Sequence, residues 1–359
     1  MIYKLFIIMI ILTSLLSCGQ SDKEKLFIVK GSENIIKILK KSQYFIKDDN
    51  YKNFHALIHK PNYKFHFVGG GSRRAIAAII DQNTTNLTLI NNTFSFDQKL
   101  LLKQFDINPL MYPFAKSEII FVVNKNNPVI SLNLSQLQGI LIGQIDNWKF
   151  EEKKEKIIIE KEEPKLKNQV THREKFIETE KIMPVGRKKS SGNYFWVYKK
   201  VLQAKSFTSI LKDFVNDSEI VNFIKNDQTG KYSIGYITKN NFNTSVTFDE
   251  LKKLEEKLDK SELEVDELEK LLIGQDLKRL IIYDDINSTE GKAFKTFHIY
   301  ITYYLVIPNV TNNLKLYIQN KDLEPLIDFF YSNEMKNLLL SKGLIPLPRP
   351  TKNIYIFNK

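Results

Sequence analysis

The sequence has 359 residues, more than one hydrophobic core usually organises, so we expect two lobes of ordinary domain size. The hydrophobic fraction of 43%, with 24 Phe and 16 Tyr, excludes a largely disordered chain. The net charge of +12 is spread along the chain, with lysines interleaved with glutamates. This pattern does not favour a nucleic-acid-binding protein, whereas an anionic ligand or a membrane surface fits the charge equally well.

The first residues have the pattern of an export signal. Lys4 supplies a positive end, and residues 5–16 form an apolar run that is too short for a permanent membrane span. The run ends in Leu15-Leu16-Ser17-Cys18, which resembles the lipobox of bacterial lipoproteins, where cleavage precedes the cysteine and its thiol is acylated. We therefore predict a signal peptide over 1–17, lipidation at Cys18 and a lipid-anchored tether over 18–25.

Cys18 is also the only cysteine in the chain. Exported proteins often carry disulfide bonds, but this chain has no second thiol with which to form one. Its stability must therefore come from its hydrophobic core and its anchoring.

The rest of the chain predicts repeated strand-turn-helix units. Apolar periodicity predicts strands at 26–30, 64–68 and 182–185, each followed by a turn and a helix, at 35–41, 75–80 and 194–202 respectively. Two β-rich runs at 118–124 and 300–308 and a short helix at 135–142 complete the pattern. Such units predict an α/β fold.

Two charged segments interrupt this pattern, at 149–181 and 248–279. We interpret both as surface insertions. Leucines and a valine at helical spacing predict two short amphipathic helices in the second segment. A solvated helical hairpin is favoured over a coiled-coil partner site, because the heptads are not sustained.

Three turns share one design, in which a Gly/Ser/Asn loop ends a strand and begins a helix. They lie at 31–34, 69–72 and 190–193. Each leaves backbone N–H groups free to bind an anion, although any one alone is explained as helix capping. Arg187, three residues before the last loop, adds a planar fork for two oxygens. Together they suit a tetrahedral oxyanion, with the helix dipoles adding partial positive charge.

On these residues the chain resembles the phosphate-binding proteins of bacterial ABC phosphate uptake systems. The matching segments follow the family's order: 31–35, 68–79, 124–129, 134–148 with its Gly143-Gln144-Ile145-Asp146-Asn147-Trp148 ending, 187–193, 229–237 with Ser233-Ile234-Gly235-Tyr236, and 326–346. The resemblance implies the type II periplasmic-binding-protein fold, with two α/β lobes, crossing hinge strands and a ligand buried in the cleft. It places lobe 1 at 26–112 and 291–359, and lobe 2 at 113–290.

The resemblance also implies a set of ligand contacts. The phosphate-binding residues would be Asn34, Ile35, Ser72, Asn92, Arg187, Ser191, Gly192 and Asn193. Hydroxyl groups and loop amides would donate to phosphate oxygens, with Arg187 as the charged clamp. The implied partners are inorganic phosphate, the permease subunits of an ABC transporter and the membrane, through the lipid anchor. We expect a monomer without a cofactor, in the cell envelope, on the outer face of the cytoplasmic membrane or in the periplasm.

The sequence departs from the family pattern at Asn34, Arg73, Arg74, Asn92, Lys189 and Asn193. Arginines replace small residues, and Lys189 replaces an acidic residue two positions after Arg187, so the site is more positive. Asn92 stands where the family has an Asp or Ser that accepts a ligand proton. An amide is a weaker acceptor than a carboxylate, which weakens discrimination against sulfate. The alternative is a degenerate member that binds another oxyanion or serves as a surface interaction or sensing lipoprotein.

An enzyme is the least favoured class. The chain has five histidines, no thiol nucleophile once Cys18 is acylated, no Walker-type loop and no Gly-x-Ser-x-Gly elbow. His55 and His59 have i, i+4 spacing without a neighbouring Glu, which favours a pair on a helix surface over a metal site. We therefore expect no catalytic residue and no metal.

Overall fold

A computed structural model describes the fold. It describes residues 24–50, 52–57, 62–81, 85, 87–148, 181–242, 253, 257, 274, 276–284, 296–308, 320–352 and 354–357. The predicted signal peptide, Cys18, His59 and nearly all of the first charged segment lie outside the described residues. No described helix is long and apolar enough to cross a membrane.

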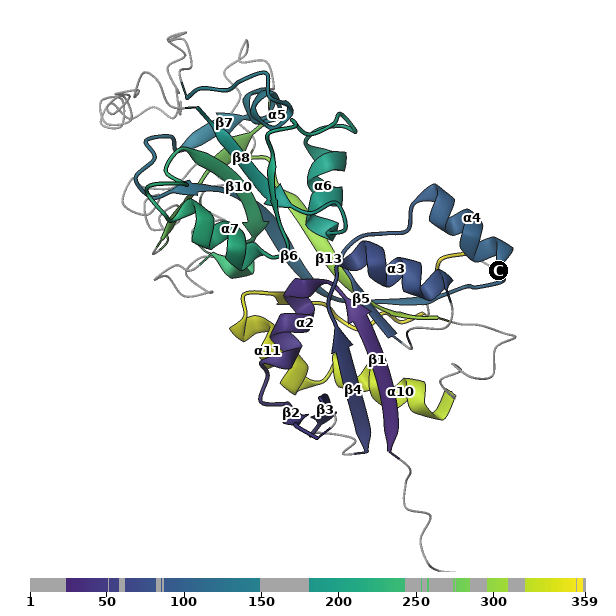
Figure 1. The fold of residues 1–359 in the computed structure, drawn as a ribbon. Helices are drawn as coiled ribbons and strands as arrows, with labels where there is room; N and C mark the ends of the chain where they lie inside the picture. Colours follow the sequence, from purple (N-terminus) through teal and green to yellow (C-terminus); the bar gives the residue numbers. More distant parts are fainter. Residues whose placement is uncertain are drawn as a thin grey trace, which may run out of the picture.

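Two bodies stand on either side of a pair of long strands (Figure 1). We call the body with β1 lobe 1 and the body with β10 lobe 2. Lobe 1 contains β1 (Lys25–Gly31), α2 (Glu33–Lys40), β2 (Phe45–Asp48), β3 (Asn53–Ala56), β4 (Tyr63–Val68), α3 (Ser72–Ile80), β5 (Leu87–Ile90), α4 (Phe96–Gln104), α10 (Asn320–Phe330) and α11 (Asn333–Ser341). Lobe 2 contains β7 (Ser131–Asn133), α5 (Leu134–Ile142), β8 (Met183–Arg187), α6 (Gly192–Lys200), β9 (Lys212–Phe214), α7 (Asp217–Ile224), β10 (Ser233–Thr238), η1 (Lys239–Asn241), β11 (Leu277–Arg279) and β12 (Ile281–Tyr283).

The two long strands are β6 (Leu110–Asn124) and β13 (Ile299–Ile307), and they run through both lobes. The strand order is β2-β3-β4-β1-β5-β13-β6-β10-β8-β9, with β11, β14 (Ile345–Pro346) and β15 (Ile354–Tyr355) also paired to β6. β13 pairs with β5 in lobe 1 and β6 pairs with β10 in lobe 2, while the two pair with each other in antiparallel fashion. The fold is a mixed α/β fold of the type II periplasmic-binding-protein class, with these two strands crossing between the lobes.

Parallel pairing explains why the functional turns gather. β1 lies parallel to β4 and β5, and β8 lies parallel to β10 and β9. The carboxyl ends of parallel strands meet at one edge of a sheet, so the turns that follow β1, β4 and β5 lie together, and the turn after β8 faces them from lobe 2.

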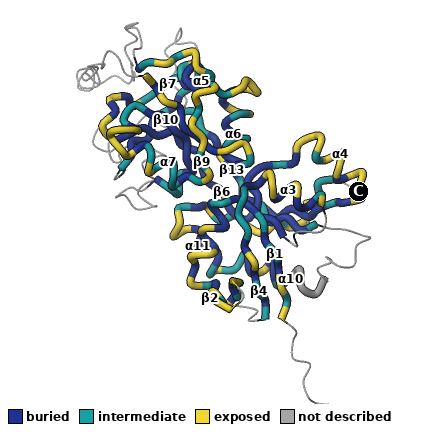
Figure 2. The backbone as a smooth tube through the Cα atoms, in the orientation of Figure 1, coloured by how far each residue is buried: buried dark blue, intermediate teal, exposed yellow. Residues whose placement is uncertain are grey.

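The core of lobe 1 follows from alternation along its strands. Phe65 and Phe67 of β4 are buried two residues apart, with His66 between them exposed. Phe45 of β2 packs edge-on against both, and Phe329 of α10 packs edge-on against Phe45. Figure 2 shows this burial as a dark centre along the strands, with exposed residues on the outer helices. Aromatic burial of this kind contributes much of the hydrophobic stabilisation.

Two expectations from the sequence are wrong. His55 lies on strand β3, not on a helix, and its Nε2 is 3.4 Å from the Asp48 carboxylate. The end of the second charged segment, β11, is a buried strand and not surface, because its charges have partners: Lys278 donates to the Asn127 carbonyl and Arg279 pairs with Glu118. Most of that segment, with its two predicted helices, lies outside the described residues. Burial lowers the pKa of Lys278 to about 8. All the strand-turn-helix units predicted are present, with boundaries shifted by at most three residues.

Candidate anion-binding site

The glycine turn before α3 brings the two lobes into contact. Gly70 and Gly71 have positive φ values of 126° and 89°, which glycine adopts without strain. A Cβ at Gly71 would lie 2.6 Å from the carbonyl oxygen of Ser190, so a side chain there would collide with lobe 2. The Arg73 backbone N–H donates to the same carbonyl oxygen at 3.2 Å. The loops after β4 and β8 therefore meet backbone to backbone.

A cluster of three polar side chains continues this contact; we call Ser72, Asn91 and Asn193 the amide cluster. Ser72 Oγ donates to Asn91 Oδ1 at 2.7 Å and accepts from the Asn91 backbone N–H at 3.0 Å. Asn91 Nδ2 donates to Asn193 Oδ1 across the lobes at 3.0 Å. Asn193 Nδ2 is buried and has no acceptor among the described residues. One amide donor of lobe 2 is thus unpaired inside the interface.

A second cluster surrounds a buried carboxylate; we call Asp217, Arg187, Asn34, Thr238 and Asn241 the Asp217 cluster. Asp217 is 1% exposed and begins α7. Its Oδ1 accepts from Arg187 Nη1, and its Oδ2 accepts from Asn34 Nδ2 at 3.0 Å, Asn241 Nδ2 at 3.0 Å, the Thr238 amide at 2.8 Å and the Thr238 hydroxyl. Asn34 belongs to lobe 1 and the other four to lobe 2, so this cluster also crosses the interface.

Arg187 is held by its other contacts as well. Its Nη2 donates to the Val215 carbonyl at 2.6 Å, and its backbone N–H donates to the Tyr236 hydroxyl at 3.1 Å. Only Nε has no acceptor among the described residues, although the side chain is buried. The guanidinium is therefore fixed in place, with its Nε without an acceptor among the described residues.

The structure brings together most of the residues predicted for the site. Asn34, Ser72, Arg187 and Asn193 make contacts in the two clusters, Ser191 caps α6 by accepting from the Asn193 amide at 3.2 Å, and Gly192 packs against Asn91. Ile35 is fully buried in the first turn of α2. Asn92 is buried next to the amide cluster, but its Nδ2 reaches only the Thr93 carbonyl at 3.5 Å, and its Oδ1 has no partner among the described residues.

Four residues of the two clusters were not predicted from the sequence. They are Asn91, Asp217, Thr238 and Asn241. Lys189, which stands where an acidic neighbour of Arg187 was expected, is exposed, and Asp217 supplies the carboxylate instead. Asn216-Asp217-Ser218-Glu219 reads as a helix start, which gives Asp217 a purely local explanation in the sequence.

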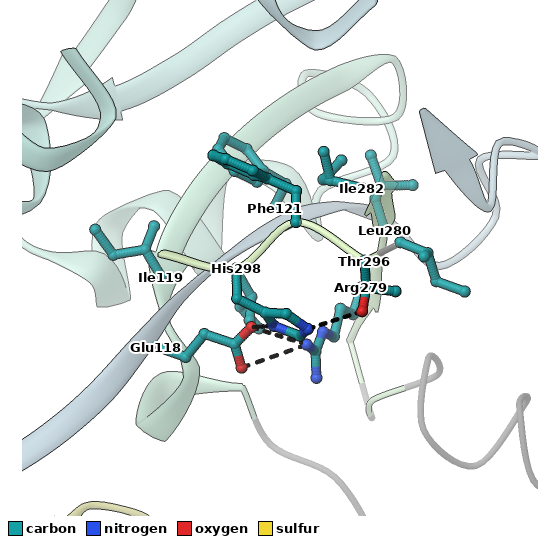
Figure 3. A pocket seen from close by; sticks show the side chains of 11 residues that line it. Glu118, Ile119, Phe121, Arg279, Leu280, Ile282, Thr296 and His298 are labelled. Atoms are coloured by element: carbon teal, nitrogen blue, oxygen red, sulfur yellow. Dashed lines mark hydrogen bonds and ion pairs between the residues drawn. The ribbon is translucent and has the colours of Figure 1, made fainter. Parts of the chain in front are cut away.

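A third cluster centres on Glu118 of β6, the neighbour of Ile119, which pairs with Thr238 (Figure 3). Glu118 of β6 accepts from Arg279 Nη2 at 3.1 and 3.3 Å and from His298 Nδ1 at 2.6 Å, and His298 Nε2 lies 3.0 Å from the Thr296 hydroxyl. Burial raises the pKa of Glu118, but Arg279 and His298 outweigh it and hold the pKa at about 2. The cluster ties β11 and the start of β13 to β6. Nowhere in the described part of the chain do three His, Cys, Asp or Glu side chains converge to hold a metal ion.

Comparison with known proteins identifies the family of the chain. A family model described as the PBP superfamily domain matches residues 56–334, which is more than half of the chain. The chain belongs to the PBP superfamily. No curated protein matches the sequence of this PBP superfamily member.

Solved structures share the fold of this PBP superfamily member. A phosphate-binding protein from Stenotrophomonas maltophilia is 12% identical with a TM-score of 0.55, covering 90% of this chain and 91% of its own. A Clostridium perfringens substrate-binding protein with bound phosphate is 15% identical with a TM-score of 0.54, covering 90% and 100%. An ABC-type phosphate transport receptor from Vibrio cholerae is 15% identical with a TM-score of 0.51, again covering 90% and 100%. At these identities the similarity establishes the fold alone.

Proposed function

We propose that this protein is an extracytoplasmic solute-binding lipoprotein that captures inorganic phosphate between its lobes and delivers it to an ABC transporter. One observation carries the proposal. Two buried donors at the interface, Arg187 Nε and Asn193 Nδ2, have no acceptor among the described residues. Buried donors are nearly always paired in proteins, and an unpaired one costs free energy. A ligand rich in acceptor oxygens would satisfy both.

The position of these donors favours a small tetrahedral anion. Both belong to the Arg187-to-Asn193 segment, which ends at the N-terminus of α6 and faces the glycine turn of lobe 1. The helix N-terminus adds free backbone N–H groups and partial positive charge. The close approach of Gly71 to Ser190 leaves little room for a larger ligand.

Asp217 supports phosphate over sulfate. Its Oδ2 accepts four hydrogen bonds, while its Oδ1 accepts only that of Arg187 in the described part of the chain. Oδ1 keeps the capacity to accept a hydrogen from the ligand. Hydrogen phosphate carries such a hydrogen at neutral pH and sulfate does not, so Asp217 would supply the acceptor that Asn92 supplies poorly.

The remaining parts of the proposal rest on the sequence pattern and on the family. We propose lipidation at Cys18, a location in the cell envelope, a monomer, and a permease partner. The proposed lobes are 26–112 with 291–359, and 113–290. The first boundary falls inside β6, which is continuous through residue 113.

The second candidate is a member of the family that binds a different oxyanion or senses rather than transports. One observation favours it. The Ser72 hydroxyl, predicted to donate to phosphate, gives its only hydrogen to Asn91 Oδ1. A site in which the Ser72 hydroxyl is already used would bind phosphate more weakly or would prefer another oxyanion.

Calorimetric titration of the purified full chain in detergent separates the two candidates. We expect saturable 1:1 binding of phosphate and much weaker binding of sulfate and molybdate. Arg187→Ala should lower phosphate affinity about a thousandfold, because it removes one partner of a desolvated charge pair. Arg187→Lys, which keeps the charge but not the fork, should also bind weakly.

The matched control is Arg349→Ala. Arg349 also pairs with two carboxylates, Glu324 and Asp328, but all three side chains are substantially exposed and belong to lobe 1. This variant should bind phosphate like the parent. Phosphate binding by folded Arg187→Ala at parental affinity would refute the site, and preference for sulfate or molybdate would establish the second candidate.

A further inference from the structure

Resting on the proposed function, we infer that the hydroxyl of Tyr303 is a further ligand contact, a neutral donor at the floor of the interlobe site. Tyr303 lies on β13, one of the two strands that cross between the lobes, and its side chain is fully buried. Its ring packs against Phe114 of the other crossing strand, with centroids 6.4 Å apart. Its sequence context is that of the other core tyrosines.

The strand opposite Tyr303 is irregular, because β6 carries a bulge there. The pairing of β13 with β6 shifts register between Tyr303 and Tyr304, whose partners are Ala115 and Pro113. A bulge of this kind re-aims the side chains beside it and is frequent next to binding sites. The extra residue of the bulge is Phe114 of β6, and its ring packs against that of Tyr303, so the irregularity sets the packing beside Tyr303.

The Tyr303 hydroxyl borders the Asp217 cluster yet has no hydrogen-bond partner among the described residues. Asn34 and Thr238 adjoin it, and the charges of Asp217 and Arg187 act on it. Both adjoining side chains use their hydrogens elsewhere. Asn34 Nδ2 donates to Asp217 and to Thr238, and the Thr238 hydroxyl donates to Asp217.

Thr238 has no acceptor capacity left for the phenol either. Its oxygen already accepts from Asn34 and from Asn241, the latter at 3.2 Å, which uses both lone pairs. Asp217 Oδ2 is saturated by four donors. None of these groups accepts the phenol hydrogen in the structure, so that hydrogen is available to an acceptor from outside the cluster.

The chemistry of the phenol defines what it binds. Burial raises its pKa well above the usual range, and the negative charge of Asp217 acts in the same direction. The group therefore stays protonated at neutral pH and offers one hydrogen. An oxygen of an oxyanion is the acceptor that fits, since the charge of Arg187 acts on the phenol and Arg187 Nε also has no acceptor among the described residues. Because Tyr303 lies on a crossing strand, the ligand would contact the hinge as well as both lobes.

Replacement of Tyr303 by Phe tests the inference with a minimal change of shape. In calorimetric titration of the full chain in detergent with phosphate, Tyr303→Phe should bind about ten- to a hundredfold more weakly, the usual effect of losing a hydrogen bond to a charged group. Thermal unfolding without phosphate should be unchanged or at higher temperature, because the substitution removes a buried group without a partner. The upward shift in unfolding temperature with phosphate should be smaller than for the parent.

The matched control is Tyr331→Phe. Its hydroxyl donates to the Pro113 carbonyl at 2.7 Å, so the substitution should lower thermal stability and leave phosphate affinity unchanged. If Tyr303→Phe is folded and binds phosphate like the parent, the hydroxyl holds at most a water and the inference is overturned while the proposed function stands. If the parent itself binds no oxyanion, it is the proposed function that fails. A variant that unfolds at lower temperature without phosphate would also overturn the inference, since the hydroxyl would then have a structural partner.

Discussion

Replacing Asp217 with Asn should strongly destabilise the protein. The carboxylate is 1% exposed and forms a buried ion pair with Arg187. Asn has the same shape, but its amide cannot satisfy the surrounding donors in either orientation. With nitrogen at the Oδ1 position it faces Arg187 Nη1, and with nitrogen at the Oδ2 position it faces the donors of Asn34, Thr238 and Asn241.

The expected loss is about 3 to 5 kcal/mol of unfolding free energy, the usual cost of leaving a buried charge uncompensated. Arg187→Met should cost a similar amount for the same reason. The double variant should be less destabilised than the sum of the two, with a coupling of about 1 to 3 kcal/mol, because neither charge is then left alone.

Urea unfolding followed by both circular dichroism and tryptophan fluorescence measures these differences, provided that the two transitions coincide. Asp328→Asn is the control. Asp328 and its partner Arg349 have side chains 62% and 38% exposed, so we expect a loss below about 1 kcal/mol. Parental stability of Asp217→Asn, or strict additivity of the double variant, would show that Asp217 is not the centre of a buried network.

Three further predictions follow from other parts of the chain. Glu118 has a pKa of about 2 instead of 4.5, so its contribution to stability is complete above pH 4.5 and is lost as the pH falls towards 2. The contribution amounts to about 3 kcal/mol of unfolding free energy. Glu118→Gln should therefore show a smaller loss of stability than the parent as the pH is lowered from 4.5 to 2. Trp196 donates to the Asn91 carbonyl across the lobes at 2.5 Å. Phosphate should therefore change the fluorescence of the Trp148→Phe variant, which retains Trp196. The fluorescence of the Trp196→Phe variant, which retains Trp148, should stay almost unaltered. An equal response from both tryptophans would contradict phosphate binding at the contact between the lobes where Trp196 lies. Cys18→Ala should release the protein from membranes or leave it unprocessed, as cell fractionation and mass spectrometry would reveal; unchanged processing and membrane attachment would exclude a lipid anchor.

The sequence was sufficient to predict the strand-turn-helix units. In each of them the apolar residues alternate along the strand and then recur at helical spacing. β1 with α2, β4 with α3, and β8 with α6 are each of this kind. It was insufficient for β6, whose predicted part began at residue 118 whereas the strand begins at Leu110. Pro113 and Lys116 interrupt the apolar run there, and the strand tolerates them because Lys116 is exposed and Pro113 lies next to the bulge in β6 itself.

The site illustrates a different limit. Arg187, Ser191 and Asn193 could be placed together because they share one loop, and local chain geometry fixes their neighbourhood. The carboxylate partner of Arg187 is 30 residues further along, and only the sheet order brings the start of α7 beside the end of β8. Asn91 and Asn92 were indistinguishable for a related reason: adjacent residues after a strand point to opposite sides, so a shift of one residue changes which of them faces lobe 2.

The most direct test of the account is a crystal structure of the protein at saturating phosphate. We predict a phosphate ion between the glycine turn of lobe 1 and the start of α6, with oxygens within hydrogen-bond distance of Arg187 Nε and Asn193 Nδ2. Phosphate bound elsewhere, or an ordered phosphate-free interface in which both donors still lack an acceptor, would contradict the proposal that the ligand binds at this interface between the lobes.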